Sequence, residues 1–374
     1  MKVFKSLICL ALVLGLLVIL AGCPEIANMA EKIEGQFDDK NGSSTQNNGN
    51  SNEKIQPKGM VYYTYFDTVS YIYTYAGDTQ EKFEENCNEV SEILGKYHKL
   101  FDIYYEHSGV VNLRTINQNA GGEPVKVDRE LVDFLLYAKE LYTLTGGEMN
   151  IMMGSVLRLW HDCREEGTRI PTEEELIEAK KHTDISLLEI DEVNCTVRIS
   201  DPKAAIDVGA VGKGYATELA AKHLEGKGVT SYVLNIGGNI RIIGTKVDGS
   251  GWDTGIKNPK NPSTYSMYLT ISNTSCVTSG DYERYYTVNG ERYHHIIDKD
   301  TLMPAKYFSS VCILTPDSGL ADALSTALFS MSYEDGLALV NRIGGVEVIW
   351  ITSDGTVYKT DGIAALENHN YGKK

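Results

Sequence analysis

An apolar run near the amino end divides this chain into parts that fold differently. Residues 7–21 contain apolar side chains and one glycine, and they follow the basic residues Lys2 and Lys5. The run is short for a membrane-spanning helix and typical of the core of a secretory signal peptide. We therefore expect residues 1–22 to direct export and to take no part in the folded protein.

The signal ends in Leu20-Ala21-Gly22-Cys23, which resembles the processing site of a bacterial lipoprotein. The resemblance implies that Cys23 becomes the lipid-modified first residue and anchors the protein on the extracytoplasmic face of the cell membrane. More than one acyl chain gives stable anchoring, whereas a single chain is marginal. An ordinary secretory signal with an incidental cysteine is the alternative.

Residues 23–58 are predicted to be a disordered linker that starts at the lipidated cysteine. The stretch 41–50 consists of Asn, Gly, Ser, Thr and Gln without an apolar residue, so burial cannot offset the entropy lost on ordering. The folded body is predicted to span residues 59–367, and residues 368–374 are predicted to form a polar tail.

The charge of the chain limits its partners. It carries 35 basic and 51 acidic residues, a formal net charge of −16. Such an acidic surface repels phosphate backbones, which argues against a nucleic-acid partner. A phosphorylated ligand would need a cation or backbone N–H groups to bind here.

Cysteine spacing gives no sign of a metal site. Five cysteines remain once Cys9 and Cys23 in the signal are set aside, and no two of them form a CxxC pair. An odd number cannot pair completely within one chain. We expect buried free thiols, although an exported protein could form one or two disulfides that the sequence does not identify.

Hydrophobic periodicity and turn residues predict alternating helices and strands. Such interspersed elements favour an α/β (α+β) layered fold with mixed or antiparallel sheets and packed helices. Helices are predicted over residues 80–101 and 217–224, after Asp128 up to Leu144, after Thr172 and from Ser332 to Gly344, and strands over 62–75, 231–243 and 346–352.

A glycine-rich segment runs from Asp207 to Gly214 and leads into a predicted helix. Glycines allow a ligand to approach the backbone, and a helix N-terminus supplies free N–H groups for phosphate. Lys213 would add a positive charge. A glycine-rich connection without a ligand is the alternative.

An apolar helix predicted over residues 318–329 contains Asp322 and Thr326, which share one side because they are four residues apart. A carboxylate and a hydroxyl are costly in an apolar helix unless something satisfies them. Mg²⁺, which takes oxygen ligands and phosphate oxygens, would do so. The alternative is that Asp322 caps the helix and Thr326 bonds back to its own backbone.

A β-hairpin is predicted around Asn289-Gly290, the strongest short hairpin signal. A two-residue turn pairs Val288 with Glu291, which puts His295 opposite Arg284. Side chains alternate along a strand, so His294 and His295 face opposite sides. A purely structural histidine is the alternative for either one.

Together with Asn235-Ile236-Gly237-Gly238-Asn239, these segments resemble, in their order, the ApbE family of bacterial FAD:protein FMN transferases. The resemblance spans about residues 60–360. It implies that FAD binds in a groove as the substrate and that Mg²⁺ bridges its pyrophosphate. The FMN half would then pass to a Ser or Thr hydroxyl of a target protein, releasing AMP.

His295 is the candidate catalytic base, because an imidazole is the natural base for a hydroxyl and the Arg284 cation would lower its pKa and keep it neutral. The alternative is that His295 only packs against the flavin or hydrogen-bonds to it. The resemblance implies roles for further residues. The metal ligands would be the carbonyl of Ala210 and the side chains of Asp322 and Thr326. FAD would contact Thr68, Phe101, Asp102, Met149, Asn150, Asp207, Lys213, His295 and Ile296.

The chain departs from the family pattern at two flavin contacts. Asn150 stands where the family has an aspartate, and Phe66-Asp67-Thr68 stands where it has M-G-T. The flavin-ring contacts are therefore the weakest part of the comparison.

Two other functions stay open at this stage. A flavin pyrophosphatase would use the same groove and send water to the phosphorus, and a flavin-binding lipoprotein would not catalyse at all. The expected acceptor of FMN is a subunit of a membrane redox complex or an extracellular flavin reductase.

Overall fold

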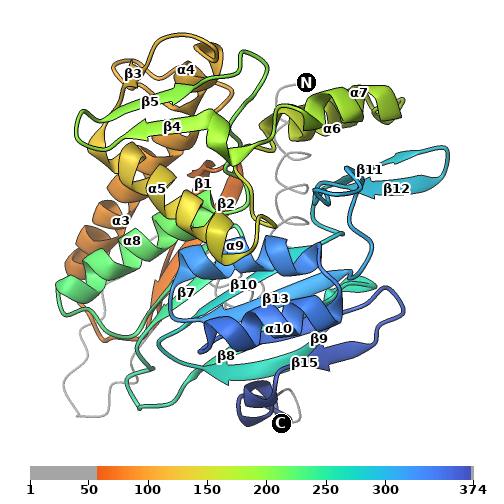
Figure 1. The fold of residues 1–374 in the computed structure, drawn as a ribbon. Helices are drawn as coiled ribbons and strands as arrows, with labels where there is room; N and C mark the ends of the chain where they lie inside the picture. Colours follow the sequence, from red (N-terminus) through yellow and green to blue (C-terminus); the bar gives the residue numbers. More distant parts are fainter. Residues whose placement is uncertain (1–56, 372–374) are drawn as a thin grey trace, which may run out of the picture.

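The computed structural model describes residues 57–371 (Figure 1). The predicted signal peptide, the lipidation site Cys23 and nearly all of the predicted linker lie outside the described residues. The first strand begins at Lys58.

One antiparallel sheet of eight strands forms the centre of the body. Its strand order is β1-β2-β6-β7-β10-β13-β14-β15, so segments distant in sequence become neighbours. The strands are β1 (Lys58–Tyr65), β2 (Thr68–Thr74), β6 (Tyr232–Ile236), β7 (Asn239–Ile243), β10 (Ser275–Gly280), β13 (Ser310–Thr315), β14 (Glu347–Ile351) and β15 (Val357–Lys359).

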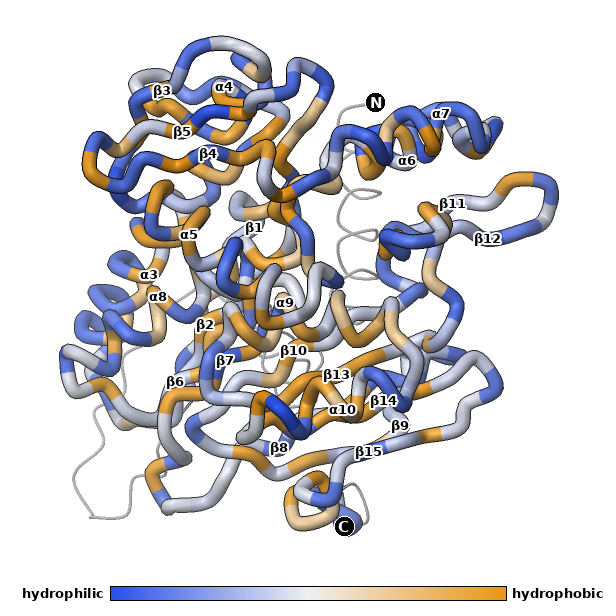
Figure 2. Tube along the Cα trace, viewed as in Figure 1, coloured by the Kyte–Doolittle hydropathy of each residue, from blue (hydrophilic) through white to orange (hydrophobic). Residues whose placement is uncertain are grey.

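Both faces of this sheet are covered, which gives three layers. On β6, Leu234 belongs to the core under the helices, whereas Val233 belongs to the core under a second hairpin. Apolar residues gather along β10, β13 and α9 in the interior (Figure 2). The covering elements are α3 (Gln80–Phe101), α8 (Gly212–Gly226), α9 (Ser318–Phe329) and α10 (Tyr333–Ile343) on one face, and β8 (Trp252–Asn258), β9 (Asn261–Ile271) and η2 (Asp361–Ala365) on the other.

The remaining elements flank the helical layer (Figure 1). They include a three-stranded sheet of order β3-β5-β4 and a projecting two-stranded hairpin, β11–β12. Their bounds are β3 (Val125–Lys126), β4 (Leu188–Asp191), β5 (Thr196–Ile199), β11 (Tyr285–Val288), β12 (Glu291–His294), α4 (Leu113–Gln118), α5 (Arg129–Leu144), α6 (Gly154–Glu166), α7 (Glu173–Lys180) and η1 (Ile185–Leu187).

Helix α6 supports the β11–β12 hairpin from the side. The indole of Trp160 donates a hydrogen bond to the carbonyl of Leu302 at 2.8 Å. Its ring stacks on Tyr293 of β12 with centroids 5.9 Å apart. The hairpin is therefore packed against the body rather than free at its base.

Most predicted elements are confirmed. Helix α3 has the predicted bounds, and α7 begins with the capping box at Thr172. The hairpin register is also confirmed, with Val288 opposite Glu291 and Tyr285 opposite His294.

Helix α5 starts directly after Asp128, as predicted; Asp128 is its N-cap residue, although its side chain makes no capping hydrogen bond. Two expectations about helix starts need correction. Helix α8 begins at Gly212, not at residue 217. Asp322 is not a helix cap, because the N-cap of α9 is Asp317, whose carboxylate accepts the N–H of Leu320 at 2.8 Å.

Four of the five cysteines in the body are buried and Cys195 is partly exposed, and none forms a disulfide in the described part of the chain. The sulfurs of Cys276 and Cys312 lie 3.4 Å apart. Within residues 57–371, none of the helices has the length and apolar character needed to cross a membrane.

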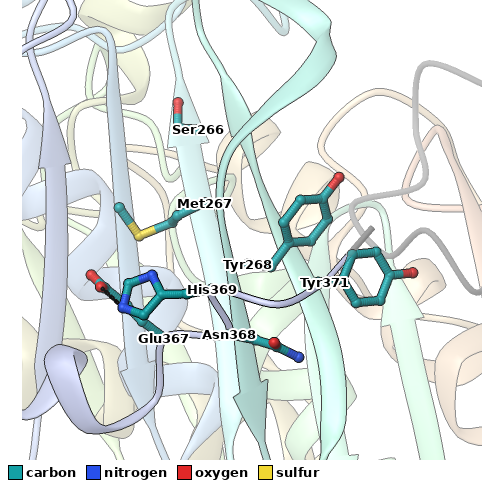
Figure 3. A pocket seen from close by; sticks show the side chains of 7 residues that line it. All are labelled: Ser266, Met267, Tyr268, Glu367, Asn368, His369 and Tyr371. Carbon is teal, nitrogen blue, oxygen red and sulfur yellow. Dashed lines mark ion pairs between the residues drawn. The ribbon is translucent and has the colours of Figure 1, made fainter. Parts of the chain in front are cut away.

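Residues 368–371, which composition assigns to a polar tail, lie against β9. The N–H of Asn368 donates to the carbonyl of Tyr268 at 2.8 Å. The rings of Tyr268 and Tyr371 stack with centroids 4.4 Å apart (Figure 3).

Candidate functional site

The site is built where α8 and α9 cross. A Cβ on Gly214 of α8 would lie 2.2 Å from the carbonyl oxygen of Ser318 and 2.5 Å from Cβ of Asp322. Only glycine lets the two backbones approach this closely. Asp322 is 4% exposed, and its Oδ2 accepts the N–H of Gly214 at 2.8 Å.

This contact changes the start of α8. In a regular helix the N–H of Gly214 would bond to the carbonyl of Ala210, four residues earlier. Here it bonds to Asp322, and no N–H of the described residues bonds to Ala210 O. Ala210 therefore keeps an unused carbonyl oxygen at the same helix end that binds the carboxylate.

The neighbouring groups suit a hard cation. Lys213 Nζ lies 3.5 Å from Oδ1 of Asp322, so the buried carboxylate has a positive neighbour. Thr326 stands one turn further along α9, and its hydroxyl has no hydrogen-bond partner in residues 57–371. A carboxylate, a hydroxyl and a carbonyl oxygen are the ligand types that Mg²⁺ takes, so the three predicted residues fit the ion.

A buried ion pair fixes the start of α9. Glu218 of α8 accepts the N–H of Ser318 at 2.9 Å and the Nε of Arg241 at 3.2 Å through the same oxygen. Both charged side chains are at most 7% exposed. This pair was not predicted, because nothing in the sequence of either segment indicates the other.

Asp207 lies beside the loop that precedes α6. Its N–H donates to the carbonyl of Ile151 at 2.8 Å, and its Oδ1 accepts the N–H of Gly209 at 2.9 Å. Burial raises the pKa of Asp207 above its ordinary value, and the Gly209 hydrogen bond opposes that shift.

His295 follows β12 and is positioned by its backbone partner. Its N–H and its Nδ1 each lie 3.1 Å from the carbonyl oxygen of Arg284. A carbonyl only accepts, so Nδ1 carries the proton and Nε2 is left as an acceptor. Burial first, and then the Arg284 cation, lower the pKa of His295 to about 3.

A purely structural role was the alternative for either histidine, and His294 has that role. It is 8% exposed, its Nε2 lies 2.9 Å from the carbonyl oxygen of Ala305, and its Nδ1 accepts the N–H of Ile296. These bonds tie the hairpin to the following turn. The expected opposite facing of the two histidines is confirmed by these different partners.

Electrostatic neighbours join these groups into one site. Lys213 and Arg284 both lower the pKa of His295, and Arg284 also opposes the raised pKa of Asp207. Other charges and rings beside Asp207 were not predicted, because no helix was expected over the residues of α6. His161 and Arg164 oppose the raised pKa of Asp207. The ring centroid of Tyr104 lies 5.2 Å from that of His161.

Some predicted FAD contacts have little access to a ligand through their side chains. Phe101, Met149 and Ile296 are 6%, 0% and 4% exposed. Asn150 is engaged at both ends of its amide, by the carbonyl of Thr183 and the N–H of Met152.

Asp102 and Thr68 have other partners. Oδ1 of Asp102 accepts the N–H groups of Tyr104 and Tyr105, and Oδ2 lies 2.8 Å from Nε2 of His107. Burial raises the pKa of Asp102, but these hydrogen bonds outweigh burial and leave it lowered. Thr68 begins β2 and lies against Gly237.

Two cavities among the described residues lie elsewhere. One of about 350 Å³ is bounded by β9 and the last described residues (Figure 3), and one of about 360 Å³ lies on the His294 side of the hairpin. Neither is lined by Asp207, Lys213 or Asp322.

Comparison with known proteins identifies the family. The ApbE family profile matches residues 64–350. The FAD:protein FMN transferase of Treponema pallidum is 32% identical over 266 residues, 67% of this chain and 73% of that protein. The ApbE protein of Thermotoga maritima has a TM-score of 0.75 at 29% identity, over 84% of this chain and 100% of that one. The flavin transferase ApbE of Vibrio cholerae has a TM-score of 0.69 at 26% identity, over 83% and 100%. The profile covers most of the chain, which therefore belongs to the ApbE family.

Proposed function

We propose that this protein is an FAD:protein FMN transferase. The observation that carries the proposal is the bond from Gly214 N–H to buried Asp322, which leaves Ala210 O without its helical partner. A carboxylate, a free carbonyl and Lys213 at a helix N-terminus suit a pyrophosphate and its cation. The names of the relatives and of the solved structures support the transfer of a flavin, not the cation.

The proposed reaction exchanges the phosphoanhydride bond of FAD for a phosphoester bond to the acceptor protein. The hydroxyl oxygen of a Ser or Thr in the acceptor protein bonds to the FMN phosphorus of FAD. The bond from that phosphorus to the bridging oxygen breaks, AMP leaves with the oxygen, and the hydroxyl proton is released. Phosphoryl transfer of this kind depends on positioning and charge neutralisation.

Ala210, Asp322 and Thr326 would hold Mg²⁺, and the bound ion would neutralise charge on the pyrophosphate oxygens. Lys213 would add a second positive charge. In an acidic protein, these positive charges would offset the repulsion of a dianionic substrate.

His295 is the proposed base for the acceptor hydroxyl. The site presents Nε2 unprotonated, as a base requires, but a pKa of about 3 gives it little affinity for a proton in the free enzyme. The negative charge of bound FAD would raise that pKa, because an anion favours the imidazolium.

The acceptor and the location are also proposals. We propose that Cys23 is lipidated and holds the enzyme on the extracytoplasmic face, where a membrane redox-complex subunit or an extracellular flavin reductase would receive FMN. In cells, Cys23→Ala should move the protein out of the membrane fraction or stop its processing. Processing of the wild type that is insensitive to globomycin would contradict lipidation.

The deciding experiment uses mass spectrometry. The protein is incubated with FAD, MgCl₂ and a candidate acceptor, and the acceptor should gain the mass of one FMN while AMP accumulates. Free FMN and AMP with an unmodified acceptor would indicate a pyrophosphatase. FAD that stays intact after prolonged incubation with the protein, MgCl₂ and the acceptor would indicate a flavin-binding protein without catalytic activity.

A further inference from the structure

The two-residue turn between β1 and β2 has an unusual backbone. Phe66 and Asp67 have φ angles of 54° and 50°, and Tyr65 pairs with Thr68 across the turn. Hairpin turns with positive φ at both positions favour Asn, Asp and Gly, because other residues are strained there. Phe66 therefore needs support from outside the turn.

His98, in the last turn of α3, supplies this support. Its Nδ1 accepts the N–H of Phe66 at 3.2 Å, and the two rings meet edge to face with centroids 5.7 Å apart. His98 thus contacts both the backbone and the side chain of the strained residue. Because Nδ1 is the acceptor, the neutral ring carries its proton on Nε2.

His98, Asp102 and His107 also have the composition of a transition-metal site, with ligand atoms within 4.8 Å of one another. The hydrogen bonds argue against that use. A histidine that binds a metal through Nε2 keeps its proton on Nδ1, whereas Nδ1 of His98 faces the N–H of Phe66. Binding through Nδ1 would displace that N–H. We therefore interpret the group as a hydrogen-bonded support for the turn.

The turn leads directly into the site. A Cβ on Gly237 would lie 2.5 Å from Oγ1 of Thr68, and the N–H of Gly237 donates to the carbonyl of Val69 at 3.2 Å. The start of β2 is thus locked against the turn between β6 and β7. Burial raises the pKa of Tyr104, and the negative charges of Asp207 and Asp67 raise it further.

We propose that His98 is a positioning residue for FAD binding. By accepting the Phe66 N–H, it holds the turn in its left-handed conformation and sets Thr68 in place for the flavin. The inference rests on the proposed function, because the role of Thr68 in FAD binding comes from it.

The test compares variants that differ in the hydrogen-bond acceptor. His98→Leu removes it, whereas His98→Asn keeps an acceptor oxygen near the position of Nδ1. We expect His98→Leu to raise the Kd for FAD at least about tenfold with kcat at saturating FAD within about threefold, and His98→Asn to stay close to wild type. His223→Leu, at an exposed position on α8, controls for loss of a histidine.

A rescue separates turn support from general damage. Phe66→Asn with Asp67→Gly gives a turn that adopts both positive φ angles unaided. When Phe66→Asn and Asp67→Gly are added to His98→Leu, the Kd for FAD should equal that of the variant that carries only Phe66→Asn and Asp67→Gly. Amide hydrogen exchange of residues 65–68 should be at least about tenfold faster in His98→Leu than in His98→Asn.

Several results would overturn the inference. They are an unchanged FAD Kd in His98→Leu, an equal defect in His98→Asn, or ZnCl₂ binding by the wild type that His107→Ala abolishes. FAD binding without FMN transfer by the wild type would overturn the proposed function and leave this inference standing. No FAD binding by the wild type would overturn both.

Discussion

At the scale of single residues, Asp322 is the group whose loss should matter most. Its buried carboxylate accepts the N–H of Gly214 and faces Lys213. We expect Asp322→Ala to lower FMN transfer at least about 10²-fold and to abolish its dependence on Mg²⁺, since such charge stabilisation supplies several kcal/mol. Transfer rates over a MgCl₂ titration measure both effects.

Thr326→Val is the matched comparison, because a neutral ligand on the same helix contributes less charge than a carboxylate. Its loss of transfer should be smaller than that of Asp322→Ala. Full activity of Asp322→Ala, with the fold intact by circular dichroism, would make the helix purely structural.

His295 should affect turnover more than affinity if it acts as a base. His295→Asn keeps a polar group near Nδ1 and removes Nε2, so kcat should fall by roughly 10²–10⁴-fold while the Kd for FAD changes little. Steady-state kinetics and FAD titration of this one variant give both constants. A weakened affinity with normal turnover at saturating FAD would mean that His295 only contacts the flavin.

The same histidine should make stability depend on pH. Its pKa is about 3 in the folded protein against an ordinary 6.5, so between these values the unfolded chain binds the extra proton. The stabilisation is fully present above pH 6.5 and is lost as pH falls toward 3. Urea unfolding at pH 7.5 and pH 5 should show a steeper loss for wild type than for His295→Asn. Equal losses would contradict the lowered pKa.

Residue types and short spacings predicted the site only in part. Asp322 and Thr326 were found because a carboxylate and a hydroxyl are out of place in an apolar helix. Glu218 and Arg241 were missed, because a buried ion pair joins segments whose separation the sequence does not reveal.

At the scale of elements, the crossing of α8 and α9 depends on Gly214. Alanine would improve helix propensity by about 1 kcal/mol, but its Cβ would lie 2.2 Å from a backbone oxygen of α9. Overpacking of this kind costs about 1–3 kcal/mol. The substitution would also shift Asp322. We expect Gly214→Ala to lower both the free energy of unfolding and FMN transfer.

Gly226→Ala is the control on the same helix, because a Cβ there meets nothing within 4 Å. It should leave transfer unchanged and stability equal or slightly higher, as measured by thermal unfolding. Equal damage from both substitutions would show that the close approach of the two helices is not what Gly214 provides.

The same crossing explains why the start of α8 was predicted wrongly. Three glycines in the segment 209–214 favour a loop by propensity, and the prediction placed the helix after them. In the folded protein the contact with α9 and the bond to Asp322 stabilise helix from Gly212 onward. The bounds of amphipathic α3 could be predicted from hydrophobic periodicity alone, without knowing which elements pack against it.

At the scale of the whole molecule, the layered architecture followed from alternating helices and strands, but the strand order did not. Hairpins such as β6–β7 are local and have strong turn signals, whereas β10 beside β7 joins distant segments. The pairing of β10 with β7 depends on packing against both faces of the sheet. Hydrophobic periodicity within one segment does not show which other strand lies beside it.

The folded body should work without the residues that precede it and without the proposed lipid anchor. The described body has covered sheet faces and begins with β1 at Lys58, which pairs with Thr74 of β2. A chain that starts at residue 57 keeps every contact described here, so it should be soluble without detergent and transfer FMN at the rate of the full chain. Gel filtration and the mass-spectrometric assay on a soluble acceptor measure this. A chain that starts at Thr68 is the control, because it lacks β1 and the Phe66 turn that His98 supports. An insoluble or inactive chain from residue 57 would mean that residues before it contribute to the folded enzyme.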